Sequence, residues 1–304
     1  MTAKKIQPPY LKAGDEVAII SPSFYIDENL LAEAVTFLEK WELKVRIGKN
    51  ASKREGPFAG SDYDRLSDLQ EMTDNRDIKA VFCSRGGYGL SKIIDKVDFS
   101  GLRNSPKWYS GFSDVTVMHM WLNEVCGVMS IHGEMALNFN NTEKSSETFP
   151  SLKKALFGDL ISHEWTGNFY KPGKVIGELT GGNLSLLYSL SGTKADVSTK
   201  GKILFIEDMG EYYYHIDRML TSLKLSGKLE SLSALIIGGV NKIEEGKIPW
   251  GKSVEETILG IVSEFDYPLF FNFPAGHISD NRAFYIGKRA TIDVKGNTAT
   301  LRYV

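Results

Sequence analysis

The chain has 304 residues, of which 42% are hydrophobic and 24% charged, and its formal net charge is -2 at pH 7. At roughly 150 residues per domain, this globular composition predicts two domains. The near-neutral charge excludes the basic footprint of a protein that binds nucleic acid or an anionic membrane. No apolar run approaches the ~20 residues of a membrane-spanning helix, and the stretch 17–20 is too short for a signal peptide. We therefore expect a cytoplasmic protein.

The first half of the chain alternates between strand-like and helix-like patterns. Short apolar runs predict strands at 15–23, 43–48, 80–84, 107–111 and 127–133. Helical spacing of apolar residues predicts helices at 28–41, 61–75, 87–97 and 113–125, the second of them with Ser61 as its N-cap. Strands separated by helices indicate an α/β domain with a parallel sheet and helices on both faces.

Residues 138–173 are polar and rich in turn formers around one short helix, which makes this region the best candidate for a linker. Beyond it we expect strands at 174–182, 202–208, 233–240 and 267–272, with helices from Asn183, over 214–226 and before 267, and two or three closing strands within 284–303. The closing strands alternate poorly with helices, so the second domain is expected to be mixed α/β. The expected division is a domain at 1–140, a linker at 141–173 and a domain at 174–304.

The two cysteines, Cys83 and Cys126, both lie in apolar contexts. We expect buried free thiols in a reducing cytoplasm, and a structural disulfide between them is the alternative.

Residues 111–114, Gly-Phe-Ser-Asp, join a predicted strand to a predicted helix through a sharp turn. This geometry lifts a serine hydroxyl out at a sheet edge, where the N–H of Asp114 can face an oxyanion at the helix N-terminus. The pattern differs from the G-x-S-x-G of α/β-hydrolases because Val115 replaces the second glycine. Ser113 is either a nucleophile or, as a serine before a helix usually is, an N-cap.

Adjacent glycines follow the strand at 80–84, where residues 83–89 read Cys-Ser-Arg-Gly-Gly-Tyr-Gly. Gly86 and Gly87 allow a close backbone approach and leave N–H groups for an anion or oxyanion. The spacing departs from the dinucleotide-binding G-x-G-x-x-G because Lys92 occupies the last position. The alternative is a tight strand-to-helix turn without a binding role.

An acid and a histidine occupy two further strand ends. Glu207 ends a buried-type strand, where a carboxylate is costly unless it is paired or lies at a site; read alone, it is more often a solvated loop carboxylate. His277 follows a Pro-Ala-Gly turn and has the best context for a general base among the five histidines. Neither histidines nor cysteines show zinc-ligand spacing, so we expect no metal and no cofactor.

These strand ends supply the three roles of a hydrolytic triad. His277 would activate the Ser113 hydroxyl, and Glu207 would hold the imidazole in the correct tautomer. Gly86, Gly87 and the N–H of Asp114 are then candidates for the oxyanion hole.

In this order the motifs resemble the LD-carboxypeptidase family of serine peptidases, which includes murein tetrapeptide carboxypeptidases and microcin C immunity peptidases. The resemblance covers nearly the whole chain, through GDEVAIISPS (14–23), RGGYG (85–89), GFSD (111–114), HG (132–133), GGNLS (181–185), IED (206–208), IDRML (216–220), IIGG (236–239), PAGH (274–277) and DN (280–281). Each motif is loose, whereas the ordered set is specific.

The resemblance implies a Rossmann-like N-terminal domain carrying the serine and a smaller mixed α/β C-terminal domain carrying the acid and the histidine. It also implies a homodimer. The family roles fall on Ser113 as nucleophile, Glu207 as acid and His277 as base, with the oxyanion held by the backbone of Asp114 and of the turn Arg85-Gly86-Gly87. Arg85 is also a candidate for holding a terminal carboxylate of the substrate. We further expect Asn183 of the GGNLS motif to contribute to substrate binding.

Two branches of the family differ in substrate. RGGYG and PAGH resemble the murein-recycling branch, which releases terminal D-alanine from tetrapeptides at an L,D bond. SHEWTG (162–167) and RNSPKWYSGFSD (103–114) resemble the immunity branch, in which a loop tryptophan, here Trp165, stacks on a nucleotide. Glu211 stands where that branch tends to have a lysine, and Glu134 stands where murein enzymes commonly have the proline of HGPM.

We therefore expect a metal-independent serine carboxypeptidase that acts on murein tetrapeptides, with no nucleic-acid or membrane partner. The alternative within the class hydrolyses amide bonds of peptidyl or aminoacyl nucleotides. The alternative of another class is a catalytically silent protein that binds muropeptides. The combination of Ser113, Glu207 and His277 favours an enzyme, because a site that only binds needs no such trio.

Overall fold

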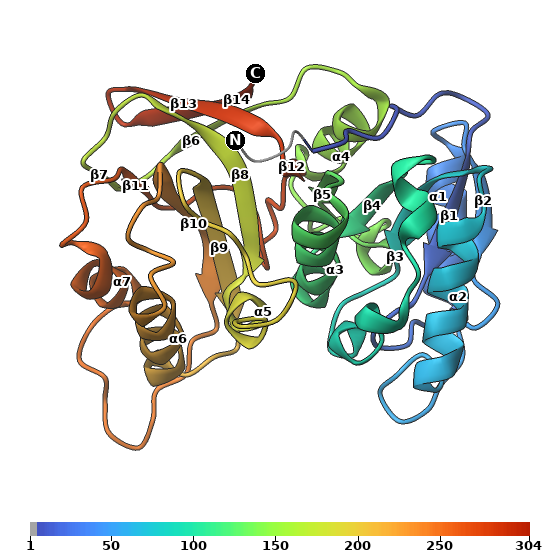
Figure 1. The fold of residues 1–304 in the computed structure, drawn as a ribbon, viewed down its shortest axis with the longest axis horizontal. Coiled ribbons are helices and arrows are strands. Elements are labelled where there is room, and N and C mark those ends of the chain that lie inside the picture. The colour runs from blue at the N-terminus through green and yellow to red at the C-terminus, as the bar shows by residue number, and fades with distance from the viewer. Residues whose placement is uncertain (1–4) are drawn as a thin grey trace. The chain divides into compact units, whose positions relative to one another are not determined.

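A computed structural model describes residues 5–304 and divides the chain into two compact units (Figure 1). Unit 1 is Met1–Leu160 with Ser279–Gly287, and unit 2 is Ile161–Ile278 with Lys288–Val304. This division differs from the expected one. The expected linker is shared between the units, because helix α4 (Thr148–Phe157) buries Leu152 and Leu156, whereas strand β6 (Ser162–Thr166) pairs with the last strand of unit 2.

Unit 1 contains a six-stranded sheet in the order β12-β5-β4-β3-β1-β2. The strands are β1 (Glu16–Ile20), β2 (Lys44–Ile47), β3 (Ile78–Cys83), β4 (Trp108–Gly111), β5 (Ser130–His132) and β12 (Phe284–Ile286). The first five are parallel, as expected, and β12 pairs antiparallel with β5. Residues 284–286 therefore return to unit 1, although the sequence pattern suggested that they close the second domain.

The helices of unit 1 lie alongside this sheet, with α2 beside β1 and β3 and α3 beside β4 and β5. They are α1 (Glu28–Glu39), α2 (Asp62–Asp74), α3 (Thr116–Met120) and α4. Ser61 is the N-cap of α2, as the sequence predicted, and it also forms a capping box with Asp64. The helix expected at 87–97 is instead two 3-10 turns, Leu90–Lys92 and Ile94–Lys96, and the helix expected at 113–125 combines 3-10, α and π segments.

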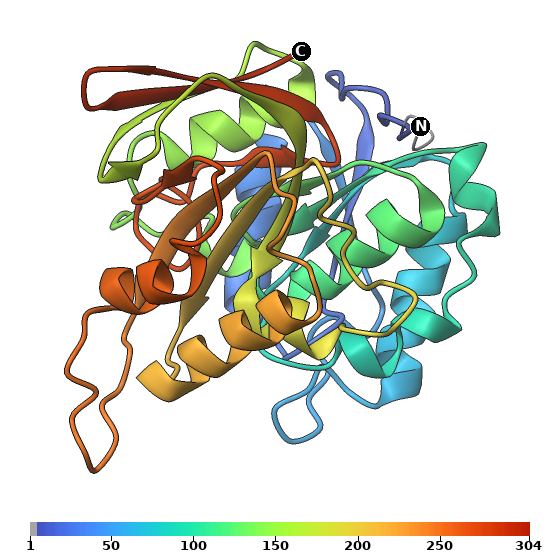
Figure 2. The same ribbon diagram turned by 60° about the vertical axis from the view of Figure 1, so that its left-hand side comes forward.

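Unit 2 contains an eight-stranded mixed sheet in the order β6-β14-β13-β8-β9-β10-β11-β7. Its further strands are β7 (Phe169–Tyr170), β8 (Val175–Asn183), β9 (Ile203–Met209), β10 (Ala234–Asn241), β11 (Leu269–Phe270), β13 (Arg289–Lys295) and β14 (Thr298–Tyr303), and its helices are α5 (Leu184–Ser189), α6 (Tyr213–Leu225) and α7 (Val254–Val262). The four central strands, β8 to β11, are parallel and the outer ones antiparallel. Figure 2 shows the loop between β10 and α7, coloured orange, extending away from the helices of this unit.

The inner parallel strands β1, β3 and β9 are near-continuous apolar runs, which is the pattern of strands buried on both faces, whereas the edge strand β2 is largely exposed. Ile19 and Phe82 are fully buried in the first sheet, as is Phe205 in the second. Cys83 and Cys126 are free and buried, which confirms the interpretation as thiols. In residues 5–304, no helix combines the length and the hydrophobicity that crossing a bilayer requires.

Candidate active site

Ser113 lies at a strained corner directly after β4. Its φ angle is +63°, a left-handed conformation that costs a residue with a side chain on the order of 1–3 kcal/mol. An N-cap residue has an extended backbone instead, and the helical segment that begins at Ser113 has no side-chain cap. The capping alternative therefore does not fit. The geometry is that of a nucleophile elbow, in which the strain presents the hydroxyl beyond the end of a strand.

Two glycines make this corner possible. A Cβ atom on Gly111 would lie 2.8 Å from Cγ2 of Val115, so the tight turn requires a glycine at this position. A Cβ atom on Gly86 would lie 2.9 Å from both Cβ and Oγ of Ser113, which places the Gly86 backbone directly against the candidate nucleophile. The turn at 85–87 and the elbow, which are separated in sequence, are thus brought together within unit 1.

The second half of the glycine turn is also fixed by its packing. Gly87 has a φ angle of +107°, and a Cβ atom there would lie 2.3 Å from Cδ2 of Phe24. Arg85 donates a hydrogen bond from Nη1 to the carbonyl of Tyr25 at 3.2 Å. The glycines and the arginine therefore hold the turn against the loop that follows β1, and the turn is ordered by contacts within unit 1.

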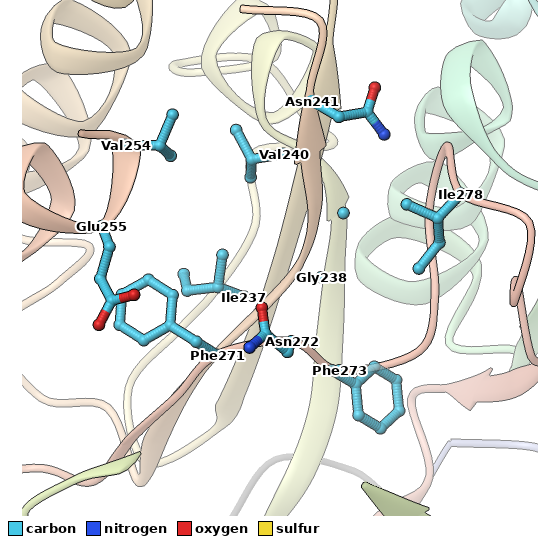
Figure 3. A pocket seen from close by; sticks show the side chains of 11 residues that line it. Ile237, Gly238, Val240, Asn241, Val254, Glu255, Phe271, Asn272, Phe273 and Ile278 are labelled. Carbon is cyan, nitrogen blue, oxygen red and sulfur yellow. The ribbon is translucent and has the colours of Figure 1, made fainter. Parts of the chain in front are cut away.

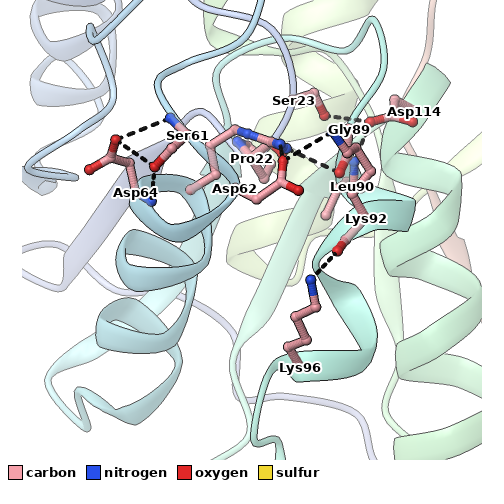
Figure 4. Close-up of polar contacts among 11 residues, drawn as sticks. Pro22, Ser23, Ser61, Asp62, Asp64, Gly89, Leu90, Lys92, Lys96 and Asp114 are labelled. Carbon is pink, nitrogen blue, oxygen red and sulfur yellow. Dashed lines mark hydrogen bonds and ion pairs between the residues drawn. The ribbon is translucent and has the colours of Figure 1, made fainter. Parts of the chain in front are cut away.

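Asp114 follows the candidate nucleophile, and its carboxyl group is fully buried. One oxygen, Oδ2, accepts hydrogen bonds from Oγ of Ser23 at 2.6 Å and from the N–H of Leu90 at 3.0 Å (Figure 4). Burial raises the pKa of this carboxyl, and the bonds from Ser23 and Leu90 oppose that shift. The sequence suggested a role only for the backbone N–H of this residue, and the side-chain contacts were not anticipated.

In unit 2, Glu207 and His277 form a hydrogen-bonded pair. Nδ1 of His277 lies 2.6 Å from Oε2 of Glu207, and the backbone N–H of His277 donates to the same oxygen at 3.2 Å. The Glu207 side chain is fully buried, whereas 16% of the His277 side chain is exposed. Since a carboxylate only accepts, the proton lies on Nδ1, and Nε2 becomes the nitrogen that can act as a base.

The backbone around this pair is shaped to hold it. Gly276 has a φ angle of +107°, and a Cβ atom there would lie 2.8 Å from Oε2 of Glu207, so the close approach requires glycine. Asn241, at the end of β10, donates from Nδ2 to the carbonyl of His277 at 2.6 Å. The Pro-Ala-Gly turn was recognised in the sequence, but the need for a glycine beside the carboxylate was not, because it depends on a contact between Gly276 and the distant Glu207.

Asp208 and Asn183 form a separate buried pair beside Glu207. Nδ2 of Asn183 donates to Oδ1 of Asp208 at 2.9 Å, and Oδ1 of Asn183 caps α5 through the N–H of Leu186. Burial, and then the charge of Glu207, raise the pKa of Asp208 to about 7. These contacts give Asn183 a structural role at the start of α5, and a role in substrate binding remains a prediction.

Trp165 lies in strand β6 and not in a loop, which corrects the expectation of an exposed stacking residue. The side chain is 6% exposed, and its indole N–H donates to the carbonyl of Phe271 at 3.1 Å. Its ring packs edge-on against Phe169, Phe270 and Phe273. Because these neighbours and the strand cover the indole, Trp165 belongs to the apolar core of unit 2.

A pocket of about 310 Å³ lies beside the loop that carries His277 (Figure 3). Its wall includes Ile278, which follows His277, and Asn241, which binds the His277 carbonyl. Val240 and Val254 supply apolar surface, and Glu255 lies at its edge. Asn241 therefore both lines the pocket and holds the backbone of His277 in place.

The other histidines are engaged elsewhere. Burial lowers the pKa of His119 to about 4, and its ring nitrogens contact Ser130 and the carbonyl of Gly111. His132 and His163 are buried, and His215 pairs with Glu211 at 2.7 Å. His277 is paired with a fully buried carboxylate, and its role as a general base stays a prediction.

Two domain models of one known family match the sequence of this chain. The family model described as the LD-carboxypeptidase N-terminal domain matches residues 17–133, and the model of the LD-carboxypeptidase C-terminal domain matches residues 176–292. The chain therefore belongs to the LD-carboxypeptidase family, and it is a serine-type carboxypeptidase. The resemblance noted in the sequence is confirmed.

Individual relatives support this assignment. A probable murein peptide carboxypeptidase of Bacillus subtilis (strain 168) is 35% identical, over 97% of this chain and 94% of its own. The crystal structure of a muramoyltetrapeptide carboxypeptidase from Oxalobacter formigenes superposes with a TM-score of 0.87 at 29% identity, covering 95% of this chain and 98% of that one. The microcin C7 self immunity protein MccF, in complex with aspartyl sulfamoyl adenosine, shares the fold with a TM-score of 0.88 at 20% identity, covering 98% and 99%.

Proposed function

We propose that this carboxypeptidase releases the terminal D-alanine of murein tetrapeptides through Ser113, His277 and Glu207. The observation that carries the triad is the combination of a strained serine elbow in unit 1 with a buried Glu207–His277 pair in unit 2. Each half has a geometry that is costly for stability and useful for acyl transfer. The proposal joins them in one reaction.

In the proposed mechanism, Ser113 Oγ attacks the carbonyl carbon of the scissile L,D bond while Nε2 of His277 takes its proton. Glu207 keeps Nδ1 protonated and stabilises the imidazolium that forms. The tetrahedral oxyanion accepts hydrogen bonds from the N–H of Asp114 and from the Gly86–Gly87 turn. His277 then donates its proton to the leaving amine of D-alanine, and water hydrolyses the acyl-enzyme by the reverse sequence of proton transfers.

A carboxypeptidase must also recognise the free carboxylate at the end of its substrate. Arg85, which adjoins Gly86 on the same turn, is the proposed donor to that carboxylate, because the N–H groups of the turn are assigned to the oxyanion. A pentapeptide stem would be a poor substrate, because its additional residue would occupy the space of that carboxylate.

Two features favour a murein peptide over a nucleotide conjugate. The Bacillus subtilis relative, which is similar over nearly the full length, is named for a murein peptide. In addition, Trp165 is buried in unit 2 and offers no open ring for a base. Hydrolysis of aminoacyl or peptidyl nucleotides remains the second candidate, because MccF, which shares this fold at 20% identity, is described in complex with aspartyl sulfamoyl adenosine.

A substrate panel tests the proposal. Wild-type protein and Ser113→Ala are given an L-Ala-D-Glu-diamino acid-D-Ala tetrapeptide, the corresponding pentapeptide and an aminoacyl sulfamoyl adenosine at matched concentrations. We expect the highest kcat/KM for D-alanine release from the tetrapeptide, and loss of that activity in the variant. A higher kcat/KM for the sulfamoyl adenosine would overturn the substrate assignment, and binding of tetrapeptide without any hydrolysis would favour a silent muropeptide-binding protein.

The proposal extends to the setting in which the enzyme works. A cytoplasmic enzyme of this specificity would act in peptidoglycan recycling, and we propose that it does so as a homodimer, as the family resemblance implied. Light scattering of the purified protein measures the assembly directly, and a mass of one chain would contradict the dimer.

A further inference from the structure

Arg65 and Asp114 have buried side chains that form hydrogen bonds with the same two loops beside the elbow. One loop, 22–23, follows β1, and the other, 89–90, follows the glycine turn. Nη1 of Arg65 donates to the carbonyls of Pro22 at 2.8 Å and Gly89 at 3.0 Å. Oδ2 of Asp114 accepts from Ser23 Oγ and from the N–H of Leu90. The carbonyl of Gly89 and the N–H of Leu90 belong to a single peptide group, which is therefore held at both ends.

These hydrogen bonds hold the Gly89–Leu90 end of the turn, while Gly86 at its other end lies against Ser113. Gly86 and Leu90 are separated by only three residues, and Gly89 between them has a φ angle of +140°. A chain with this conformation has little intrinsic preference for it, so it needs external contacts to remain in place. Arg65 is itself oriented by an ion pair with Asp62, which also lies 3.3 Å from Nζ of Lys92.

Both of these ionisable side chains are removed from water. Arg65 is 1% exposed and Asp114 is fully buried, although isolated buried charges are costly. Among residues 5–304, Oδ1 of Asp114 has no hydrogen-bond partner, so the carboxyl group is held by one oxygen alone. A buried carboxyl group with an unpartnered oxygen lowers the free energy of unfolding. We therefore look for its function in the turn that it positions.

We propose that the side chains of Asp114 and Arg65 are positioning residues that hold the 86–90 turn in register with the Ser113 elbow, so that its N–H groups meet the oxyanion. The inference rests on the proposed role of Ser113. The carboxyl of Asp114 acts through the turn and does not touch the reacting atoms, whereas its backbone N–H belongs to the oxyanion hole itself. Correct placement of these donors matters mainly in the transition state, so its loss lowers kcat more than it raises KM.

Steady-state kinetics of D-alanine release from the tetrapeptide test this inference. Asp114→Ala should lower kcat by ~10²–10³, the usual effect of losing one oxyanion donor, with KM within about threefold of wild type. Asp114→Asn should recover kcat to within about tenfold of wild type, because its amide oxygen, placed where Oδ2 lies, can accept from both Ser23 and Leu90. Ser23→Ala, a milder change, should lower kcat about tenfold, the equivalent of one hydrogen bond.

Asp68→Asn is the matched control. Asp68 is another buried carboxylate of unit 1 whose pKa is raised by burial, and it binds Asn50 and not the turn. Its kcat should stay close to that of wild type. The inference is overturned if Asp114→Ala and Ser23→Ala keep wild-type kcat, if Asp114→Asn is as impaired as Asp114→Ala, or if Asp68→Asn loses as much. A fully active Ser113→Ala would instead defeat the proposed function, so the two failures are distinguishable.

Discussion

Glu207 and His277 share a hydrogen bond of 2.6 Å between Oε2 and Nδ1, and one oxygen of the carboxylate also receives the backbone N–H of the histidine. The bond fixes both the tautomer and the orientation of the imidazole. Because the Glu207 side chain has no exposure to water, its charge acts on the histidine with little screening. In the proposed mechanism, this arrangement prepares the pair for proton transfer before any substrate is present.

Replacement of this carboxylate tests the tautomer argument. Glu207→Gln should leave the protein folded but lower kcat by up to ~10⁴, the effect of the corresponding Asp→Asn change in chymotrypsin-like proteases, because an amide can stabilise the wrong tautomer. Kinetics and circular dichroism of the variant measure both effects. Full activity of Glu207→Gln would move the role of the acid to another group, with Asp208 as the nearest candidate.

Addition of one methyl group at the glycine turn tests the contact between Gly86 and the proposed nucleophile, Ser113. Gly86→Ala would place Cβ 2.9 Å from Ser113 Oγ, so either the serine or the turn must shift, and we expect kcat to fall by ~10² or more because a small misplacement is expensive in catalysis. Gly101→Ala is the control, since a Cβ atom there meets nothing within 4 Å. Equal activity of the two variants would show that the close contact has no part in the reaction.

The buried position of Trp165 gives a prediction that separates the two substrate classes. Trp165→Ala should lower the free energy of unfolding by about 3–5 kcal/mol, because it leaves a large cavity among Phe169, Phe270 and Phe273. Trp165→Phe should lose less. Denaturant unfolding measures this difference. A stable Trp165→Ala protein that has specifically lost binding of an adenosine conjugate would restore the stacking role.

The raised pKa of Asp208 predicts that the free energy of unfolding depends on pH. Burial and the charge of Glu207 raise its pKa from 3.8 to about 7, so between these values the folded protein keeps a proton that the unfolded chain has lost. The free energy of unfolding should therefore fall as pH rises from about 4 to about 7. Asp208→Asn removes this titration, and its thermal midpoint should decline less over that range than that of wild type. Parallel pH profiles of the two proteins would contradict the raised pKa.

The sequence predicted the parallel sheet of unit 1 and the mixed sheet of unit 2, because strand and helix periodicities are local properties. It could not predict that residues 284–286 pair with β5, since strand partners separated by about 150 residues leave no local pattern. The same reason explains the division of the expected linker, where α4 and β6 are assigned by packing against different units.

For the candidate site, too, the sequence revealed local features and missed contacts between distant residues. Strand ends identified Ser113, Glu207 and His277, because polar residues after apolar runs are visible in sequence. The supporting contacts of Arg65 and Ser23 were missed, since neither residue stands in a recognisable catalytic motif and both act through backbone groups of distant loops. Trp165 was misplaced because a strand with alternating burial inside a polar, turn-rich segment resembled a loop.

Ser113 is the proposed nucleophile, and the most direct test is the rate of D-alanine release by Ser113→Ala. The strained elbow should tolerate alanine as well as it tolerates serine, so we expect an unchanged thermal midpoint. We also expect kcat to fall by at least ~10⁴, as it does when other hydrolases lose the nucleophile of a triad. A folded Ser113→Ala protein with kcat within about tenfold of wild type would contradict the role of Ser113 as nucleophile, because no triad retains its rate without its nucleophile.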